Sequence, residues 1–345
     1  MYNILLIFTG GTIGSTIEKH VINTDPANQY TLIDLYRKKY PRASEIQFQT
    51  LAPYEILSEN LVPNHWEKLI AAIDETDHSL YDGIIVTHGT DTLAYSACAL
   101  SFAYAQVKLP LVLVSSNFTL ADSRANGLDN FNAAIEFIIQ KQQTGVFVAY
   151  RNQKQNVKIH LGSRLSSCFP LDDTFMSIQD KTYLEFDDQK FIELNPFPNS
   201  LTANPHILPS SLQFSSSILL IKPYPGLNYN FFNLQDVQVI VHDLYHSGTA
   251  CITDNWGQQH SLIKFISHCR AQGISFYLAP ALISENTYIT TQLMLDAGAR
   301  MIWNTSIEAA YVKLSLAYGA IDDTQARQYF IDQNIAHEQL ESTIV

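Results

Sequence analysis

Two short segments of this chain place threonines beside glycines, directly after apolar runs. The first is TGGTIGS, Thr9–Ser15, which follows the apolar stretch MYNILLIF. The second is HGTDT, His88–Thr92, which follows DGIIVT. A threonine hydroxyl attacks a carbonyl carbon when a base or a proton relay activates it, and glycines allow the backbone to come close to a ligand. These residue types therefore suit a nucleophile carried on a turn.

The glycines of the first segment do not match the patterns of nucleotide-binding turns. Gly10, Gly11 and Gly14 give G-G-x-x-G, whereas a dinucleotide-binding turn has G-x-G-x-x-G. A phosphate-binding P-loop needs a lysine after its glycines, and the first lysine of the chain is Lys19. Thr12 is left as a hydroxyl at the carboxyl end of a strand, where open α/β sheets bind ligands.

Thr90 and Asp91 also have a structural interpretation, because either residue is a good N-cap for the helix predicted to follow. A carboxylate at a helix N-terminus is favoured by the helix dipole. A cap does not explain why a second turn with threonine and glycine lies at the same end of the predicted sheet as the first. We therefore expect Thr12, Thr90 and Asp91 to surround one crevice.

Alternating strands and helices are predicted to position these turns. The predicted strands are Asn3–Phe8, Ile46–Leu51, Gly83–Thr87, Leu111–Val114 and Val146–Tyr150, and Lys154–His160 is predicted to form part of a hairpin. The predicted helices are Pro63–Asp74, Thr92–Tyr104 and Ser123–Ile139. This alternation is typical of a mostly parallel sheet with helices on both faces.

A change of composition near residues 191–213 divides the chain. NPFPNSLTANPHILPSS is rich in proline and polar residues and predicts a linker. Strands are then predicted at Ser217–Ile221, Val237–Val241 and Ile274–Leu278, and helices at Ser261–Ala271, Thr287–Ala297, Ser306–Leu316 and Thr324–Leu340. We expect an α/β protein with a larger N-terminal domain at residues 1–190 and a smaller α/β domain at residues 214–345.

Charge and cysteine content argue against several classes of protein. The formal net charge is −12, and even the tightest basic group, Arg37 to Lys39, is better explained as a solvated loop or helix face, so nucleic-acid binding is not expected. The four cysteines form no C-x-x-C pair, and no cluster with metal-ligand spacing is evident. Isolated cysteines and an N-terminus without signal-peptide features favour the cytoplasm, and no apolar run is long enough to span a membrane.

Together the two threonine segments resemble the motifs of the bacterial-type L-asparaginase family, most closely its cytoplasmic type I branch. TGGTIG and HGTDTLAYSA follow each other at that family's spacing. The likeness continues through SENLVPNHWEKL, KLPLVLVSSNFTLADSRANGLDNFNAA, IKPYPGLN and SIEAAYVKL. The resemblance implies a two-domain fold and hydrolysis of the side-chain amide of L-asparagine, or a related amide, to L-aspartate and ammonia without a cofactor.

The resemblance also implies a role for each matching residue. Thr12 would be the nucleophile, and Thr90 would lie beside the carbonyl group under attack. Asp91 would hold the α-ammonium group of the substrate. Ser58 would hold the α-carboxylate, with Glu59 near the amino group. Backbone N–H groups of the turn that carries Thr90 would donate to the developing oxyanion.

Further residues take supporting roles by the same resemblance. Tyr30, in NQYT, matches the family's loop tyrosine, and Glu308 matches the glutamate behind that tyrosine. Family sites lie between the N- and C-terminal domains of paired subunits, which implies a homodimer or a homotetramer. Glu308 and Thr249 would then contribute across the pair.

The chain departs from the family at its relay lysine. The matching segment is HLGSRLSSCFPLDDTF, where the lysine position falls on Ser166 or Ser167, and no lysine occurs between Lys158 and Lys181. A serine can pass a proton but supplies neither a positive charge nor an amine base. Loss of one relay member can lower turnover by several orders of magnitude.

Two further positions also differ from the family. Thr249 stands where the family tends to have an asparagine that reaches a neighbouring subunit's substrate. Asp243 or a neighbour replaces the basic residue expected at the effector site of the type I branch. These differences leave the substrate and the regulation open.

Two interpretations follow. In the first, the chain is an active amidohydrolase in which Lys158, Arg164 or His246 replaces the lysine. In the second, it is a weakened homologue that binds an amino acid or acts on a different amide, such as one in a peptide or conjugate. We favour an enzyme because a binding protein has no need of both threonines. A component of a tRNA-dependent amidotransferase ranks third, because such relatives carry an added N-terminal region and this chain begins at its first strand.

Overall fold

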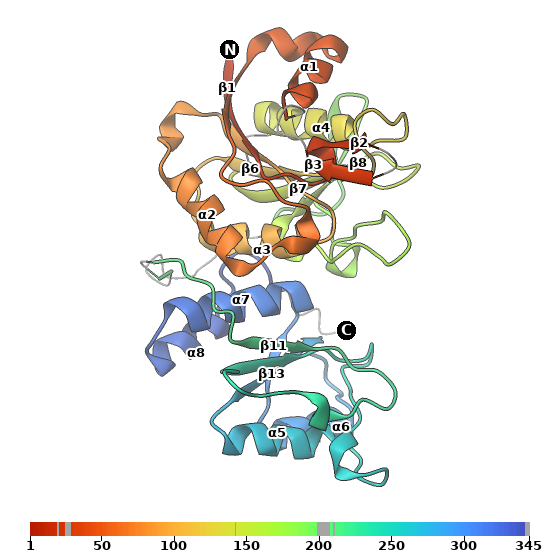
Figure 1. Cartoon of the computed structure of the whole chain (residues 1–345), viewed down its shortest axis with the longest axis vertical. Helices are drawn as coiled ribbons and strands as arrows, with labels where there is room; N and C mark the ends of the chain where they lie inside the picture. The colour runs from red at the N-terminus through yellow and green to blue at the C-terminus, as the bar shows by residue number, and fades with distance from the viewer. Residues whose placement is uncertain (19–20, 25–28, 142, 199–207, 210, 342–345) are drawn as a thin grey trace. The chain divides into compact units, whose positions relative to one another are not determined.

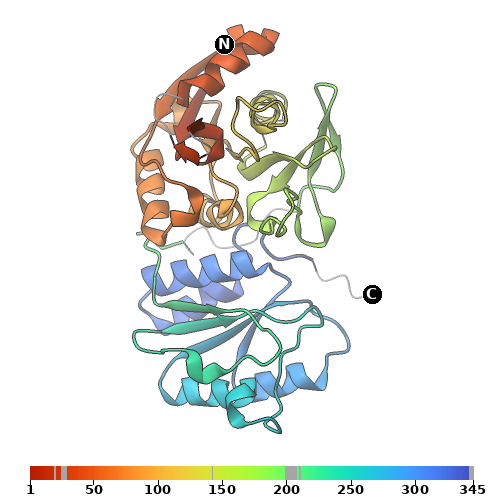
Figure 2. The ribbon, with the colours of Figure 1, turned by 45° about the vertical axis from the view of Figure 1, so that its right-hand side comes forward.

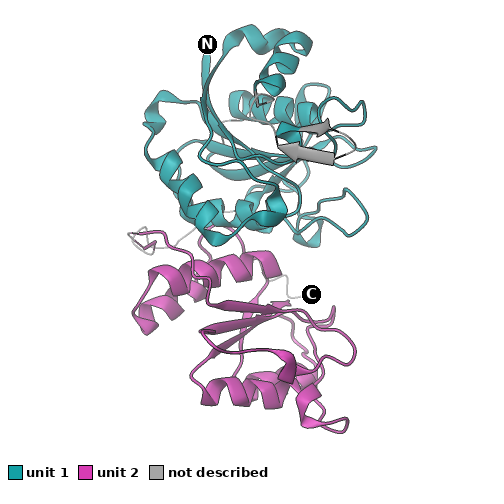
Figure 3. Cartoon of the chain, viewed as in Figure 1, with its two compact units in different colours: residues 1–205 teal, residues 206–345 magenta. Residues whose placement is uncertain are grey.

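The chain forms two compact units, Met1–Pro205 and His206–Val345, in a computed structural model (Figure 3). The structure describes residues 1–18, 21–24, 29–141, 143–198, 208–209 and 211–341. The two units divide inside the segment 191–213 that was predicted as a linker. Strand β10 (Lys190–Glu193) takes up the first residues of that segment.

The first unit is built on an eight-stranded sheet with the order β10-β9-β8-β7-β6-β5-β1-β4 (Figure 1). The mutually parallel strands are β1 (Tyr2–Phe8), β4 (Ile46–Leu51), β5 (Gly83–Thr87), β6 (Pro110–Val114) and β7 (Gly145–Arg151). Strands β8 (Val157–Leu161), β9 (Leu184–Asp187) and β10 extend the sheet in antiparallel fashion. Every parallel strand predicted for this domain is confirmed, and so is the hairpin.

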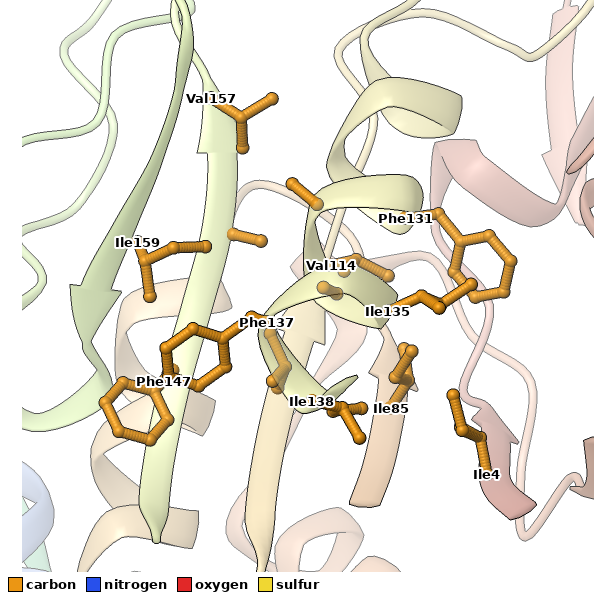
Figure 4. Close-up of a cluster of buried hydrophobic side chains, with 14 of the residues drawn as sticks. Ile4, Ile85, Val114, Phe131, Ile135, Phe137, Ile138, Phe147, Val157 and Ile159 are labelled. Carbon is orange, nitrogen blue, oxygen red and sulfur yellow. The ribbon is translucent and has the colours of Figure 1, made fainter. Parts of the chain in front are cut away.

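Helices cover both faces of this sheet. Helices α1 (Gln29–Lys39) and α4 (Gly127–Gln140) share a buried cluster with the alternate β1 residues Ile4, Leu6 and Phe8. Figure 4 shows side chains of α4 over the sheet within this cluster. Helices α2 (Pro63–Asp74) and α3 (Leu93–Ala103) lie on the other face (Figure 1). Leu5 and Ile7 are also fully buried, as expected for a strand covered on both sides.

Helix α2 shows how local sequence and packing agree. It begins at Pro63, and proline is favoured at a first helical position because it has no N–H to leave unpaired. Its buried side chains are Trp66, Leu69, Ile70 and Ile73, which recur at the spacing of one helical face. The indole nitrogen of Trp66 donates to the Ser96 hydroxyl at 2.9 Å, which attaches α2 to α3.

Some elements of the first unit were not predicted. Helix α1 buries Leu32, Ile33 and Tyr36, and most of its other residues are polar. The basic residues 37–39 form its last turn, where positive charge is favoured by the helix dipole. The hairpin of β2 (Ser15–Glu18) and β3 (Val21–Thr24) directly follows the first threonine turn. Strands β9 and β10 were also missed.

The second unit has a four-stranded parallel sheet with the order β11-β12-β13-β14. Its strands are β11 (Ile218–Ile221), β12 (Val239–His242), β13 (Ser275–Ala281) and β14 (Arg300–Trp303), and only β14 was not predicted. Helices α5 (Leu262–Ala271) and α6 (Ile289–Asp296) lie on one face, and α7 (Ile307–Ala320) and α8 (Thr324–Asp332) on the other (Figure 2). The protein therefore has the expected α/β fold with a larger and a smaller parallel-sheet domain.

The predicted helix Thr324–Leu340 is too long, because α8 ends at Asp332. Beyond it the Glu338 carboxylate accepts hydrogen bonds from the backbone N–H groups of Ile335 and Ala336, at 3.0 and 2.8 Å. The same carboxylate binds the amine of Lys313 on α7 at 2.7 Å. These bonds stabilise a turn in place of a continued helix.

Candidate active site

Both threonine turns leave the same edge of the first sheet. Strands β1 and β5 are adjacent and in register, with Phe8 opposite Thr87. The Thr9 hydroxyl donates to the Thr87 carbonyl at 2.6 Å, and the His88 N–H donates to the Val114 carbonyl at 2.9 Å. The carboxyl ends of β1, β5 and β6 are thereby joined where the turns begin.

Glycines fit three segments against one another at this edge. Gly10 and Gly11 have φ angles of 99° and 77°, which side-chain-bearing residues rarely adopt. A Cβ atom on Gly11 would lie 2.5 Å from the Cα of Gly89. A Cβ on Gly89 would lie 2.5 Å from the Cβ of Ser58. Thr12 and Thr90 follow directly after two glycines whose backbones touch.

Ser58 joins the second turn through three hydrogen bonds. Its hydroxyl donates to the Asp91 carboxylate at 3.2 Å and accepts from the Asp91 N–H at 3.2 Å. The Thr92 hydroxyl donates to the Ser58 carbonyl at 3.0 Å. Ser58 itself is buried, whereas Asp91 and the neighbouring Glu59 are exposed. The structure therefore places the exposed Asp91, which follows Thr90 in the second turn, beside Ser58.

The interpretation of Thr90 or Asp91 as a helix cap is wrong. Helix α3 begins at Leu93 with Thr92 at the N-cap, and no described side chain caps its N–H groups. The Asp91 carboxylate instead accepts the Ser58 hydroxyl. Because Asp91 is exposed, it is accessible to a ligand.

The segment that follows β8 also reaches this site. Asn152 exchanges two hydrogen bonds with the backbone of Phe175, at 2.8 and 2.9 Å, and Asn117 donates to Asp173 at 3.0 Å. Burial, and after it the charges of Asp173, Asp172 and Asp91, raise the pKa of the Cys168 thiol to about 11. Cys168 is therefore within electrostatic reach of Asp91, and its thiol is protonated at neutral pH.

No lysine amine hydrogen-bonds to or pairs with Thr12, Thr90 or Asp91 among the residues that the structure describes. Lys158 lies within β8, opposite Tyr150 and Glu185. Arg164 is buried in the short turn after β8, two residues before Ser166. The assignment of the relay position to Ser166 or Ser167 therefore remains a prediction.

The remaining predicted residues are less closely tied to this cluster. Tyr30 is exposed at the start of α1, and its ring packs edge-on against Phe8 with centroids 6.4 Å apart. Glu308 is buried in the first turn of α7, in the second unit. Thr249 and the exposed His246 belong to a loop of the second unit.

The family model "Asparaginase, N-terminal" matches residues 3–196. The chain belongs to the asparaginase family. Its likeness to solved members is seen in the fold: the thermostable L-asparaginase of Thermococcus kodakarensis has a TM-score of 0.79 at 23% identity, covering 99% of this chain and 100% of that one. L-asparaginase I of Vibrio cholerae has a TM-score of 0.76 at 20% identity and covers 99% of each chain.

Two curated relatives of this chain are named as amidotransferase subunits and not as asparaginases. A glutamyl-tRNA(Gln) amidotransferase subunit from Methanobrevibacter smithii is 25% identical over 347 residues, covering 97% of this chain and 76% of that protein. The corresponding protein of Thermofilum pendens is 26% identical, covering 97% and 74%. The family is confirmed, and the narrower expectation of the type I branch gains no support from these relatives.

His88 is a buried residue of the second turn to which the sequence analysis gave no role. Its Nδ1 lies 2.8 Å from the carbonyl oxygen of Gly89. Burial lowers the pKa of the imidazole to about 4, so the ring is neutral at pH 7. His88 therefore braces the turn that carries Thr90 and is poorly suited to act as a cationic acid.

The asparagines that hold the loops were also missed. Asn117 and Asn126 exchange backbone-to-side-chain hydrogen bonds of 2.9 and 3.1 Å. Asn130 bridges Ser115 and Arg151 with bonds of 2.8 Å. Their signal in the sequence is the recurrence of asparagine just after β6 and β7 and at the start of α4, where loops need side-chain partners for their backbone groups.

In the part of the chain that the structure describes, no three side chains of His, Cys, Asp or Glu gather closely enough to hold a metal ion. No helix in those ranges has the length and hydrophobicity needed to cross a bilayer.

Substituting Gly11 should damage the site and the fold together. In Gly11→Ala the methyl group would overlap the Gly89 backbone at a φ angle that alanine adopts only with strain. We expect a loss of about 2–4 kcal/mol in the free energy of unfolding, measured in urea, and a loss of amide hydrolysis. Gly14→Ala is the matched control, because nothing lies within 4 Å of its Cβ position. Equal stability of the two variants would contradict the close contact of the turns.

Two buried histidines of the first unit predict that the protein loses stability in acid. His160 has a pKa lowered to about 3 by burial and by Lys158, and that of His88 is lowered to about 4. The unfolded chain takes up protons below about pH 6.5 while the folded chain does not. Titration of the two rings therefore has no effect on stability above about pH 6.5, and it lowers the free energy of unfolding as the pH falls from 6.5 toward 4. We expect the free energy of unfolding to fall by up to about 1.4 kcal/mol for each pH unit and each of the two histidines.

Urea unfolding at several pH values between 4 and 7 measures this loss. His246→Gln is the matched control, since that exposed histidine should not alter the profile. If the free energy of unfolding stays constant between pH 4 and 7, the imidazole rings of His88 and His160 are not buried in their neutral form.

Proposed function

We propose that the chain hydrolyses a side-chain amide with Thr12 as the nucleophile and releases ammonia. The main observation in support of this proposal is the close contact between Gly11, Gly89 and Ser58. Thr12, Thr90 and Asp91 follow these glycines at one edge of the sheet. Membership of the asparaginase family supports the same class of reaction. A metal is not required for this chemistry.

The proposed reaction has two stages. The Thr12 hydroxyl attacks the amide carbon, and its proton passes to the departing nitrogen, which leaves as ammonia. Water then attacks the acyl-threonine ester, adds its hydroxyl to the acyl group and returns a proton to Thr12. Backbone N–H groups at Gly89 and Thr90 are proposed to donate to the oxyanion in both stages.

The charges at the site suggest which part of a substrate it accepts. Asp91 and Glu59 are both exposed carboxylates, and in the described residues neither forms an ion pair. A carboxylate favours a substrate ammonium group, because the charge-assisted hydrogen bond between them contributes about 1.5–3 kcal/mol. It repels a free α-carboxylate nearby, so the carboxyl group that the family resemblance places at Ser58 would bind better without its charge.

We therefore propose a substrate with a free α-ammonium group and a blocked α-carboxyl group, such as an N-terminal asparagine or glutamine residue or an aminoacyl ester. Free L-asparagine would be a poor substrate, in keeping with the missing lysine. The names of the curated relatives refer to glutamyl-tRNA, which supports a substrate whose amide belongs to a larger molecule. Those relatives also favour a second candidate function, the supply of ammonia to a partner amidotransferase.

Ammonia release from a panel of amides tests the proposal. The panel contains free asparagine, free glutamine and dipeptides with N-terminal asparagine or glutamine, with Thr12→Ala as the blank. We expect the dipeptides to be hydrolysed faster than the free amino acids. Fast hydrolysis of free asparagine would contradict the blocked carboxyl group, and an absence of ammonia from all amides would contradict the reaction.

Restoring an amine near Asp91 should raise turnover. Ser167→Lys places a cation in the segment whose next residue, Cys168, is within electrostatic reach of Asp91. We expect hydrolysis to rise by about tenfold or more, because relay members act together. Ser167→Met, of similar length but uncharged, should not do so. An unchanged rate in Ser167→Lys, measured by ammonia release, would show that a lost lysine does not limit the reaction.

Assembly and location are proposed from the family resemblance. The proposal is a homodimer or homotetramer in the cytoplasm, with Tyr30, Glu308 and Thr249 completing a site shared by two subunits. A solved relative with a TM-score of 0.72 is named a probable cytoplasmic L-asparaginase of Campylobacter jejuni. Light scattering that finds a fully active monomer would exclude the shared site.

A further inference from the structure

The second unit contains a cavity of about 300 Å³ on the amino-terminal side of its sheet. Its walls come from the end of α5, the first residues of β13 and β14, the end of α7 and the first turns of α8. All of these segments lie within one compact unit. The amide chemistry proposed above involves none of them.

Three arginines line this cavity, Arg270, Arg300 and Arg327. Arg270 donates to the Ala297 carbonyl at 3.0 Å, and Arg300 donates to the side-chain oxygen of Gln328. Arg327 donates to the Ile321 carbonyl at 3.2 Å, and its guanidinium lies 4.3 Å from the centre of the Tyr318 ring. No carboxylate pairs with any of the three within the described ranges.

A glycine provides the space for one of these guanidinium groups. Gly298 has a φ angle of 102°, and a Cβ atom there would overlap the guanidinium of Arg270, with Nε only 2.7 Å away. The Arg270 guanidinium therefore occupies space that a Cβ atom at position 298 would need. Gln328 holds the opposite wall, since it accepts from the Tyr277 hydroxyl at 2.9 Å and donates to Asp332 at 2.7 Å.

The chemistry of the cavity favours one class of ligand. Guanidinium groups bind the oxygens of phosphate and carboxylate groups through paired hydrogen bonds. Three positive groups around one space match the charge and the three terminal oxygens of a phosphate monoester better than a single carboxylate. The volume is at the lower end of small-molecule sites, and the buried residues Phe276 and Tyr277 add aromatic surface.

We propose that this cavity binds a small phosphorylated ligand, with its phosphoryl group between Arg270, Arg300 and Arg327. A nucleic-acid backbone is a poorer match. Such backbones bind along extended basic surfaces, whereas this cavity is a local hollow of about 300 Å³ in an acidic chain.

Calorimetric titration of the whole chain tests the proposal with ribose 5-phosphate, AMP and inorganic phosphate as probes and ribose as the uncharged control. We expect saturable binding of at least one phosphorylated probe and none of ribose. Arg270→Gln and Arg300→Gln should each weaken that binding by about tenfold or more, in keeping with one charge-assisted bond lost. Arg124→Gln is the matched control, because that arginine pairs with Asp122 in the first unit.

Two glycine variants distinguish the effect on binding of displacing Arg270 from the effect of backbone strain alone. Gly298→Ala forces the guanidinium away and should weaken binding, whereas Gly226→Ala, at a φ angle of 84° with nothing within 4 Å and outside the cavity, should not. Circular dichroism checks that each variant is folded. The proposal is overturned if no phosphorylated probe binds at millimolar concentrations, if Arg124→Gln loses as much affinity as the cavity variants, or if an RNA oligonucleotide binds more tightly than every small probe.

Discussion

Thr12→Ala should abolish measurable amide hydrolysis and leave the fold intact. The proposed reaction forms its covalent bond through this hydroxyl, and loss of a nucleophile lowers turnover by several orders of magnitude. Thr12 is half-buried in a short turn, and its hydroxyl forms no hydrogen bond within the described ranges. The free energy of unfolding should therefore change by less than about 0.5 kcal/mol. Ammonia release and urea unfolding measure the two effects separately.

Two variants make this test specific. Thr12→Ser keeps a hydroxyl at the same position and should retain part of the activity. Thr76→Ala removes the hydroxyl that donates to the Ile73 carbonyl at the end of α2, and should leave turnover unchanged. Hydrolysis by Thr12→Ala at the normal rate would rule out Thr12 as the nucleophile.

Lys313→Met should strongly destabilise the second unit. The Lys313 amine and the Glu338 carboxylate are both 1% exposed and 2.7 Å apart. Removing one partner leaves the other charge buried without its counterion, which typically costs about 3–5 kcal/mol. The Glu338 carboxylate also binds two backbone N–H groups, so the segment after α8 should loosen as well. Urea unfolding and amide hydrogen exchange measure the two effects.

A lysine of the same unit offers a matched control. Lys264 is exposed and lies 3.7 Å from Asp254, so Lys264→Met should change the free energy of unfolding by less than about 1 kcal/mol. The double variant Lys313→Met with Glu338→Gln should be more stable than Lys313→Met alone, because no buried charge remains. If Lys313→Met and Lys264→Met unfold at the same urea concentration, the buried pair contributes little to stability.

The position of the two threonine turns could be predicted from sequence because each follows an apolar strand, and parallel strands end at a common edge. The contribution of Ser58 came only from the family resemblance, since a serine at the start of a loop has no periodic signal. The site residues Thr12, Thr90 and Asp91 are close in space, while their catalytic roles remain predictions. The cap interpretation failed because helix α3 begins at Leu93 with Thr92 at its N-cap, and the Asp91 carboxylate accepts from Ser58, 33 residues away in the sequence.

Other features depend on contacts that no local pattern shows. Helix α1 has a narrow apolar face, so its sequence resembles a solvated segment. The end of α8 depends on Glu338, which binds backbone groups only after the chain has turned. The sequence analysis placed an amidotransferase role third, and two curated relatives are named as subunits of a glutamyl-tRNA(Gln) amidotransferase.

The contact between Gly11, Gly89 and Ser58 has a consequence for how activity arises during folding. These residues meet only after segments 33 and 78 residues apart in the chain have come together, as the bonds Ser58–Asp91 and Thr9–Thr87 show. Loop-closure entropy must be overcome before such distant contacts give any stabilisation. A nascent or partly refolded chain can already contain its helices and β1 without a functional nucleophile. Enzymatic activity would thus report completion of the central sheet, and truncated or misassembled chains would release no ammonia.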